Sequence, residues 1–313
     1  MTLDGSYDLN RETYNGELTL SRFPLDRFLT VDSLGSASAN FRLEGRYFSW
    51  PQAKTSVNAG IRQLFYKEHE YKDITLQATL DKTHLRGTMV SKDPDAPLDL
   101  VFRGDSLQQQ YQVGLGGYIG KVDLQALHLM QEPLTMGLKV DLQGFIGEHS
   151  AYALKARFDS LSMADSRKTY TLGSLDIDMA SDLKKTTLDV KTGDLQLTFR
   201  ADTSLAGFGE SAGKIAGIVG KQIAGKDIDM EQIKAELPVF SMHLKGDQNN
   251  AIAKFLKARN MGFRRLSLDI VSRQRSGIRM GITATAPYFG TVRLDSVQMG
   301  IWQTGKSLVY ALG

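Results

Sequence analysis

The run GKQIAGK at residues 220–226 is the stretch whose spacing is most suggestive of chemistry. Its two glycines and final lysine follow the GxxxxGK pattern of a phosphate-binding loop. Asp227 stands where that loop requires a Ser or Thr hydroxyl for magnesium, and the surrounding residues predict a helix rather than a turn after a buried strand. We therefore predict a helix of small residues that packs closely against a neighbour, and no nucleotide site.

Metal sites need imidazoles or acids at spacings that bring them together. No histidine has a ligand partner at helical or hairpin spacing, so we expect no zinc site. The acid pairs Asp176/Asp178 and Asp227/Asp229 lack the glycine of a calcium loop and are predicted to be solvated surface. The histidines considered are His69, His84, His128, His149 and His243.

Nucleophilic catalysis finds no support either. No serine lies in a GxSxG elbow, and the tetrapeptide RGDS at residues 103–106 is interpreted as the end of a strand rather than an adhesion motif. The glycines of residues 114–120 do not fit GxGxxG and are interpreted as strand bulges or bends. We expect a protein that is not an enzyme and that has no cofactor.

Composition narrows the class of protein further. The 313 residues are 42% hydrophobic, which is enough to form a core, and they carry a net charge of only +3 with basic and acidic residues interleaved. A nucleic-acid binder would need clustered basic residues, so none is expected as a partner. The chain contains no cysteine and no run of about 20 apolar residues that would predict a membrane helix.

The elements that dominate the chain are short strands with one apolar side. Ile74, Leu76, Ala78 and Leu80 alternate with polar residues, and alternation resumes at Leu85 after a polar break. The proline-rich stretch at residues 92–97 ends that second strand, and Leu98, Leu100 and Phe102 begin a third.

This three-strand unit is repeated along the sequence. Residues 173–205 repeat it, including Phe-Arg-Ala-Asp at 199–202 against Phe-Arg-Gly-Asp at 102–105, and a looser version begins at Leu266. Because one unit cannot bury its own apolar side, repetition predicts a stacked, elongated and mostly β architecture. Strand alternation is present at residues 1–7 and again at 310–313, so we expect a piece of a longer polypeptide.

The period changes in one part of the chain. Residues 207–224 and 229–237 have helical spacing, a short strand is expected at 240–244, and residues 249–260 form an amphipathic helical pattern. We therefore predict three parts: a repeated β section at 1–205, a helical insert with one short strand at 206–261, and a β continuation at 262–313.

An apolar face repeated over many strands can have either of two structural roles. It can be closed by a second layer, as in a sandwich, or it can remain open as a trough for acyl chains. Residue types alone favour the closed core. The residues predicted to line a trough are Ile74, Leu76, Ala78, Leu80, Leu98, Leu100, Phe102, Leu175, Ile177, Leu195, Leu197, Phe199, Leu266, Leu268 and Ile270.

Three stretches carry a resemblance to a known family. They are GKVDLQAL at residues 120–127, YKDITLQATL at 71–80 followed by Leu85-Arg86-Gly87, and DSLGSASAN at 32–40 followed by Leu43-Glu44-Gly45. These degenerate strand patterns, which extend over most of the chain, resemble the TamB branch of the AsmA-like proteins, in particular the long versions of Bacteroidetes-type bacteria. The helical insert departs from that pattern.

The resemblance implies a curled, taco-like β-sheet in the periplasm, within a protein anchored in the inner membrane. It implies phospholipid acyl chains as partners, an outer-membrane barrel of the TamA or BamA type as a partner of regions outside this chain, and a role in moving phospholipid to the outer membrane. It therefore shifts the preference from the closed core to the lipid trough.

Three alternatives remain besides the closed β-sandwich. An assembly factor would template outer-membrane protein strands at its sheet edges. An outer-membrane barrel also alternates, but the polar helical insert and the missing aromatic girdles argue against it. A carbohydrate-binding β enzyme would need an acid pair in a cleft, which the sequence does not identify.

Overall fold

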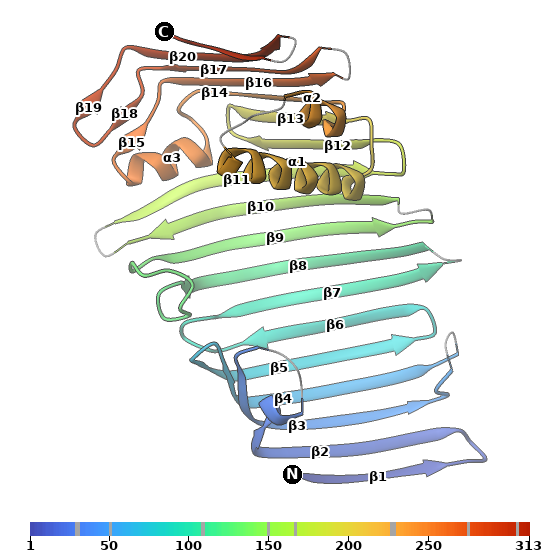
Figure 1. Ribbon diagram of the computed structural model, residues 1–313. Coiled ribbons are helices and arrows are strands. Elements are labelled where there is room, and N and C mark those ends of the chain that lie inside the picture. The colour runs from blue at the N-terminus through green and yellow to red at the C-terminus, as the bar shows by residue number, and fades with distance from the viewer. Residues whose placement is uncertain are drawn as a thin grey trace. The chain divides into compact units, whose positions relative to one another are not determined.

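The computed structural model describes residues 1–28, 32–49, 52–107, 110–148, 151–165, 168–225, 230–273, 276–304 and 307–313. Strands dominate, and eighteen of them belong to one antiparallel sheet (Figure 1). The predicted mostly-β class, with a long sheet interrupted by short helices, is therefore confirmed.

The chain divides into two compact units. Unit 1 comprises Met1–Gly144 and Phe158–Thr171, and unit 2 comprises Phe145–Arg157 and Leu172–Gly313. The strands β9 (Thr135–Ile146), β10 (Tyr152–Ala164) and β11 (Thr169–Ser181) contribute residues to both.

Unit 1 is a meander in which each strand pairs antiparallel with the next. Its strands are β1 (Thr2–Asp8), β2 (Thr13–Pro24), β3 (Leu34–Arg46), β4 (Lys54–Tyr66), β5 (His69–Asp81), β6 (His84–Ser91), β7 (Leu98–Leu107) and β8 (Gln110–Asp123), with a 3-10 turn at Leu25–Arg27 between β2 and β3. Short turns suffice because antiparallel neighbours need no crossover.

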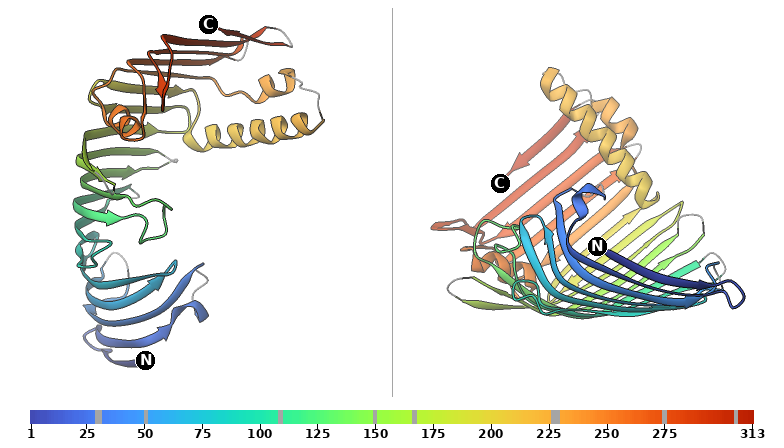
Figure 2. Two further views of the ribbon diagram at one scale, coloured as in Figure 1. Left: turned by 90° about the vertical axis from the view of Figure 1, so that its left-hand side faces the viewer. Right: turned by 90° about the horizontal axis from the view of Figure 1, so that it is seen from below.

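Irregular positions bend the longer strands of unit 1. The pairing of β2 with β3 shifts register between Leu20 and Phe23, and the pairing of β3 with β4 shifts between Leu34 and Ala37. Each shift inserts a bulge, which bends a strand and re-aims the side chains beyond it. The bends of β2 and β3 are visible when the molecule is viewed from below (Figure 2).

Unit 2 continues the same strand-to-strand pairing but with helices inserted. Its strands are β12 (Thr186–Thr192), β13 (Leu195–Ala201), β14 (Phe240–Gly246), β16 (Arg265–Arg273), β17 (Gly277–Thr285), β20 (Ser296–Thr304) and β21 (Ser307–Leu312), and β15 (Met261–Gly262), β18 (Tyr288–Phe289) and β19 (Val292–Arg293) form a separate small sheet. The helices are α1 (Leu205–Gly225), α2 (Met230–Glu236) and α3 (Ala251–Ala258).

The helical period of the sequence is confirmed in all three helices. Asn250 starts α3, because its side chain accepts a hydrogen bond from the Ala253 amide at 2.7 Å, a typical N-cap. Lys214 of α1 pairs with Glu236 of α2 at 3.6 Å, so these two helices form a hairpin.

One strand prediction is wrong at its end. The alternating run at residues 120–127 suggested a strand, but β8 ends at Asp123. The Asp123 carboxylate accepts hydrogen bonds from the amides of Gln125 and Ala126 at 2.9 and 3.0 Å, which turns the backbone out of the ladder. Leu127 and Leu134 are buried in the connection that follows.

Candidate functional site

Strand register sorts the side chains of unit 1 into two faces. Because successive side chains point to opposite faces, residues paired across strands share a face. One row of paired residues crosses all eight strands: Leu3, Leu18, Phe41, Ala59, Leu76, Met89, Leu100 and Gly117.

Two further rows run beside the first. One comprises Gly5, Gly16, Leu43, Val57, Ala78, Gly87, Phe102 and Leu115, and the other comprises Tyr7, Tyr14, Gly45, Thr55, Leu80, Leu85, Gly104 and Val113. We call the surface that bears these three rows the apolar face of unit 1. None of the three rows contains a charged residue.

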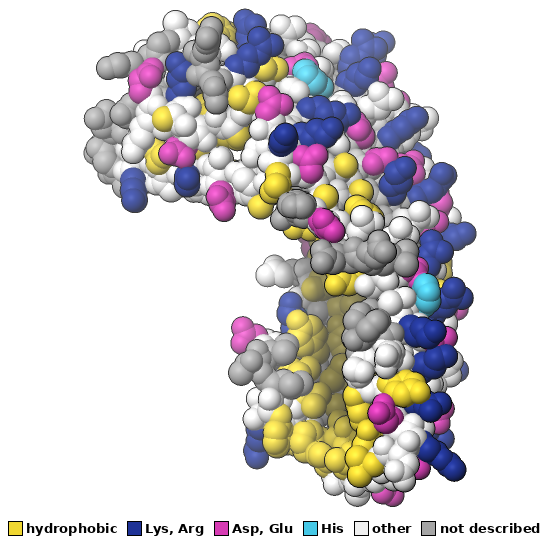
Figure 3. Space-filling model, turned by 90° about the vertical axis from the view of Figure 1, so that its right-hand side faces the viewer, with side chains coloured by type: hydrophobic (Ala, Val, Ile, Leu, Met, Phe, Trp, Pro, Cys, Tyr) yellow, Lys and Arg dark blue, Asp and Glu magenta, His cyan; other side chains and the backbone are white. Residues whose placement is uncertain are grey.

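The apolar face of unit 1 is partly open to solvent. Leu43 and Leu85 are each 39% exposed, whereas Ile74, deeper on the same face, is 7% exposed. Among the strands that the structure describes, unit 1 has no second sheet stacked on this face. The space-filling view shows hydrophobic side chains gathered in a hollow over the N-terminal strands (Figure 3).

Unit 2 has an apolar face built in the same way. One row comprises Ile177, Val190, Leu197, Leu244, Leu268, Ile282, Met299 and Leu312. A second comprises Met179, Leu188, Phe199, Met242, Ile270, Met280, Ile301 and Tyr310. These rows also contain no charged residue.

The residues predicted to line a trough lie on these two faces. Those of residues 74–102 are on the apolar face of unit 1, and those of residues 175–270 are on the apolar face of unit 2. Ile74 and Leu195 are buried, at 7% and 1% exposure, and the others are half-buried. Leu195 is therefore a core residue, and its role as lining stays a prediction.

The predicted lining omits several residues of the same rows. Phe41 and Met89 in unit 1 and Leu244, Ile282 and Met299 in unit 2 stand in line with predicted positions. The signal is the same alternation of apolar and polar residues, which is present in their own strands. Met89 lies within the first three-strand unit, whereas Phe41 and Leu244 lie in strands outside the repeats.

The opposite faces, which we call the polar faces, carry cross-strand ion pairs. In unit 1, Glu17 stands opposite Arg42, with their side chains 3.4 Å apart, and Lys54 pairs with Asp81 at 3.2 Å. In unit 2, Arg200 donates two hydrogen bonds to Asp189, at 2.8 and 2.9 Å. Opposite charges on paired strands stabilise this register over a slip by one residue.

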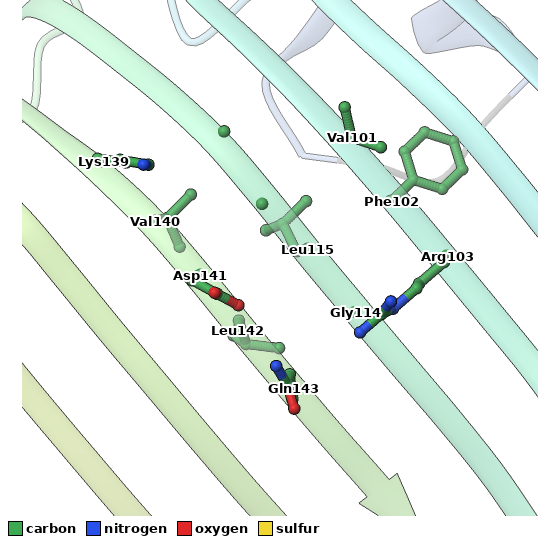
Figure 4. Close-up of a pocket in the computed structure, with 12 residues that line it drawn as sticks. Val101, Phe102, Arg103, Gly114, Leu115, Lys139, Val140, Asp141, Leu142 and Gln143 are labelled. Atoms are coloured by element: carbon green, nitrogen blue, oxygen red, sulfur yellow. The ribbon is translucent and has the colours of Figure 1, made fainter.

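Two depressions lie on the polar face of unit 1. The first, of about 320 Å³, is bordered by Arg103 on β7, by the small residues Gly114 and Gly116 on β8, and by Lys139 and Asp141 on β9 (Figure 4). The second, of about 330 Å³, is lined by polar residues such as Asn58 and Gln77. Both are shallow spaces over small side chains and bring together no acid-base or nucleophile pair, so we place the candidate site on the apolar face instead.

Helix α1 begins on the apolar face of unit 2. The Phe208 ring contacts Phe199 and Phe240, with centroids 5.0 and 5.3 Å apart, and both partners belong to that face. The Leu205 amide donates to the Ser181 hydroxyl at 2.9 Å. From there α1 extends away from the strands of unit 2 (Figure 2).

The predicted close packing of small residues along α1 is wrong. A methyl group added at Gly209, Gly213, Gly217 or Gly220 would meet no atom within 4 Å, so these glycines face open space in the described structure. The residues of the GxxxxGK run up to Gly225 are helical, which is not the geometry of a phosphate-binding loop. Lys226, Asp227 and Asp229 lie outside the described residues.

The remaining sequence motifs have structural partners. Arg103-Gly104-Asp105 lies within β7, and Asp105 pairs with His84 at 2.5 Å. Asp176 and Asp178 pair with Arg157 and Lys155, each at 3.8 Å. The ion pairs agree with the interpretation of Asp176 and Asp178 as surface, and the position of RGDS just before the last residue of β7 agrees with its interpretation as the end of a strand.

The glycine-rich strand β8 has one irregular backbone position. Gly117 has φ +147°, which agrees with the predicted backbone irregularity in the glycine-rich strand.

The histidines lie apart from one another. His243 pairs with Asp269 on the polar face of unit 2, and His128 lies in a turn with φ +57°. His149 lies outside the described residues, and His69 is buried at the first position of β5.

Comparison with known proteins adds no relative. No family model, no curated protein and no solved structure matches the chain. Within the described residues, no helix has the length and hydrophobicity required to span a membrane.

Proposed function

We propose that this chain is a non-enzymatic segment of a bridge that carries phospholipids between two membranes along a hydrophobic β-groove. The observation that carries the proposal is the set of uncharged rows. At about 4.8 Å per strand, a row over eight strands runs about 34 Å, roughly twice the depth of one bilayer leaflet. Acyl chains would lie along the rows, with head groups toward the solvent.

The hydrophobic effect favours an acyl chain as the ligand of these rows. An acyl chain needs an apolar lining and no directional partners, and each buried CH₂ contributes about 0.8 kcal/mol. A row of similar aliphatic side chains offers similar binding at every step, so movement along it is diffusion on a nearly level surface. A charged side chain in a row would interrupt this path.

The resemblance to the TamB branch of the AsmA-like proteins supports the same proposal. It adds a location in the periplasm of a Gram-negative envelope, as part of a protein anchored in the inner membrane. It also adds a TamA- or BamA-type barrel as a partner of regions outside this chain. These additions rest on the resemblance alone.

Site-specific photocrosslinking in cells tests the proposal. A photoreactive residue is placed at Leu100 or Leu197 on the apolar faces, and at Val101 or Gln196, their neighbours on the polar faces, as matched controls. We expect phospholipid adducts at the first pair alone. Absence of lipid adducts at both Leu100 and Leu197 would indicate a face closed by protein and would refute the proposal.

A second candidate function is assembly of outer-membrane proteins by strand addition. Its support is the long antiparallel sheet itself, because a sheet edge can accept a further strand through backbone hydrogen bonds. Protein adducts in the crosslinking experiment, with outer-membrane protein assembly lost on placing proline in an edge strand, would favour this candidate.

A further inference from the structure

A buried cluster of possible metal ligands lies at the end of the apolar face in unit 1. His69, the first residue of β5, and Asp93 and Asp95, in the turn between β6 and β7, place their ligand atoms within 4.8 Å of one another. No spacing in the sequence signalled this cluster. Its members come from two turns 24 residues apart, which the pairing of β5 with β6 brings side by side.

The imidazole of His69 is available to a ligand. His69 is 9% exposed, and its Nε2 atom has no hydrogen-bond partner in the described structure. The Nε2 atom points toward Asp93 Oδ1 at 3.6 Å, which is too far for a hydrogen bond. A metal ion about 2.0–2.1 Å from both atoms would make an angle of about 120° at that separation.

The carboxylate of Asp93 is rigidly held. Its Oδ1 accepts hydrogen bonds from the amides of Asp95 and Ala96 at 2.9 and 3.1 Å, and its Oδ2 accepts one from the Lys72 amide at 2.8 Å. Asp93 is 1% exposed. These bonds orient the turn and place both aspartates beside His69, as outer contacts orient ligands in metal sites.

Lys72 donates its backbone amide to Asp93, whereas its ammonium group pairs with Glu70, 2.9 Å away. The Tyr71 ring contacts the His69 ring edge-on, with centroids 4.5 Å apart. A cation beside Asp93, which is 1% exposed, would offset the cost of burying its carboxylate.

We propose that His69, Asp93 and Asp95 form a structural binding site for a divalent cation of the zinc class. An imidazole with two carboxylates suits zinc or a similar transition ion, because calcium and magnesium take oxygen ligands alone. The ion joins the β4–β5 turn to the β6–β7 turn and so fixes one end of the apolar face. The site is independent of the lipid proposal.

Metal titration of the full chain after chelation tests the site. We expect one equivalent of Co²⁺ to bind with visible d–d absorption and Zn²⁺ to displace it. His69→Gln and Asp95→Asn should each weaken Zn²⁺ binding at least about tenfold. Loss of even an outer contact of a metal site typically lowers metal affinity about 10–100-fold, and loss of a ligand should lower it at least as much. The control is the double variant His84→Gln, His243→Gln, which removes the two exposed His–Asp pairs. It should bind Zn²⁺ with the same affinity as the parent chain.

Two results would overturn the site: no binding of Zn²⁺ or Co²⁺ by the parent chain, or undiminished binding by His69→Gln. If His69→Gln does not fold, Asp95→Asn decides. The Asp95 carboxylate is half-buried and accepts no hydrogen bond within the described part of the chain, so folding should survive its loss. Undiminished binding by folded Asp95→Asn would then reject the site.

Discussion

The ring of Phe208 on α1 meets the ring of Phe199 on β13 edge to face, with centroids 5.0 Å apart and planes at 81°. Phe199 lies in an uncharged row of unit 2, so the first turn of α1 uses the same surface that we propose for acyl chains. This contact explains how a helical insert can begin without interrupting the sheet. It also makes the anchoring of α1 open to test.

Phe208→Ala should release the α1–α2 hairpin while the sheet of unit 2 persists. The substitution removes aromatic contacts with Phe199 and Phe240, each contributing about 0.5–1.5 kcal/mol, so anchoring should weaken by about 1–3 kcal/mol. Limited proteolysis should then cut within residues 205–237 more rapidly. Leu205→Ala, on the same helix at an exposed position, should leave the rate unchanged. Equal rates for Phe208→Ala and the parent chain would contradict the anchoring role.

Leu100→Asp should weaken lipid binding while Val101→Asp does not. The first places a carboxylate in an uncharged row and forgoes a leucine contribution of about 1.5–3 kcal/mol, or roughly tenfold or more in affinity. The second places the same group on the polar face, where Val101 is 56% exposed. Phospholipid retained on the purified, folded variants measures the difference. Equal retention would count against the apolar face as the binding surface.

Gly213→Ala and Gly217→Ala should each stabilise α1 by about 1 kcal/mol. Glycine in a helix interior costs about that much relative to alanine, and the added methyl group meets open space at both positions. Urea denaturation followed by helical circular dichroism gives the change. Gly193→Ala is the opposite control, because its φ is +57° and its methyl would overlap the Asn249 carbonyl oxygen. A loss of stability at Gly213 would show that this helix face is covered.

Asp194 should make stability depend on acid pH. Partial burial tends to raise its pKa, but hydrogen bonds from the Asn250 side chain and from the amides of Asn249 and Asp247 outweigh this and lower the pKa below its ordinary value. The folded state therefore binds this proton less readily than the unfolded state. The resulting stability is present above the ordinary carboxyl range near pH 4 and is lost as pH falls through the lowered value.

Asp194→Asn removes the charge that these donors stabilise. We expect it to lower the free energy of unfolding at pH 7 by about 1 kcal/mol, a value reduced for the solvent exposure of the group, and to flatten the dependence on pH between about 5 and 2. Asp189→Asn, which removes an exposed ion pair with Arg200, should cost less than half as much. An unchanged acid profile in Asp194→Asn would contradict the role of this carboxylate.

The strands and their faces could be predicted from the sequence because alternation is a local property. Ile74, Leu76 and Leu80 share one side of any extended strand, whatever the strand pairs with. The helices followed from the same reasoning, since Asn250 and the apolar residues of α3 lie at the spacings that a capped helix needs. The uncharged composition of the apolar face was thus already present in the pattern of residues.

Register and long-range contacts were decided by the tertiary structure. Which residue stands opposite Leu100 depends on turn geometry and bulges, and the sequence pattern does not specify it. The burial of Leu195, the contact of Phe208 with Phe240, and the cluster of His69 with Asp93 and Asp95 all join segments distant in sequence. Local periodicity determines which way a side chain points, whereas only the packing of the whole chain determines what it meets.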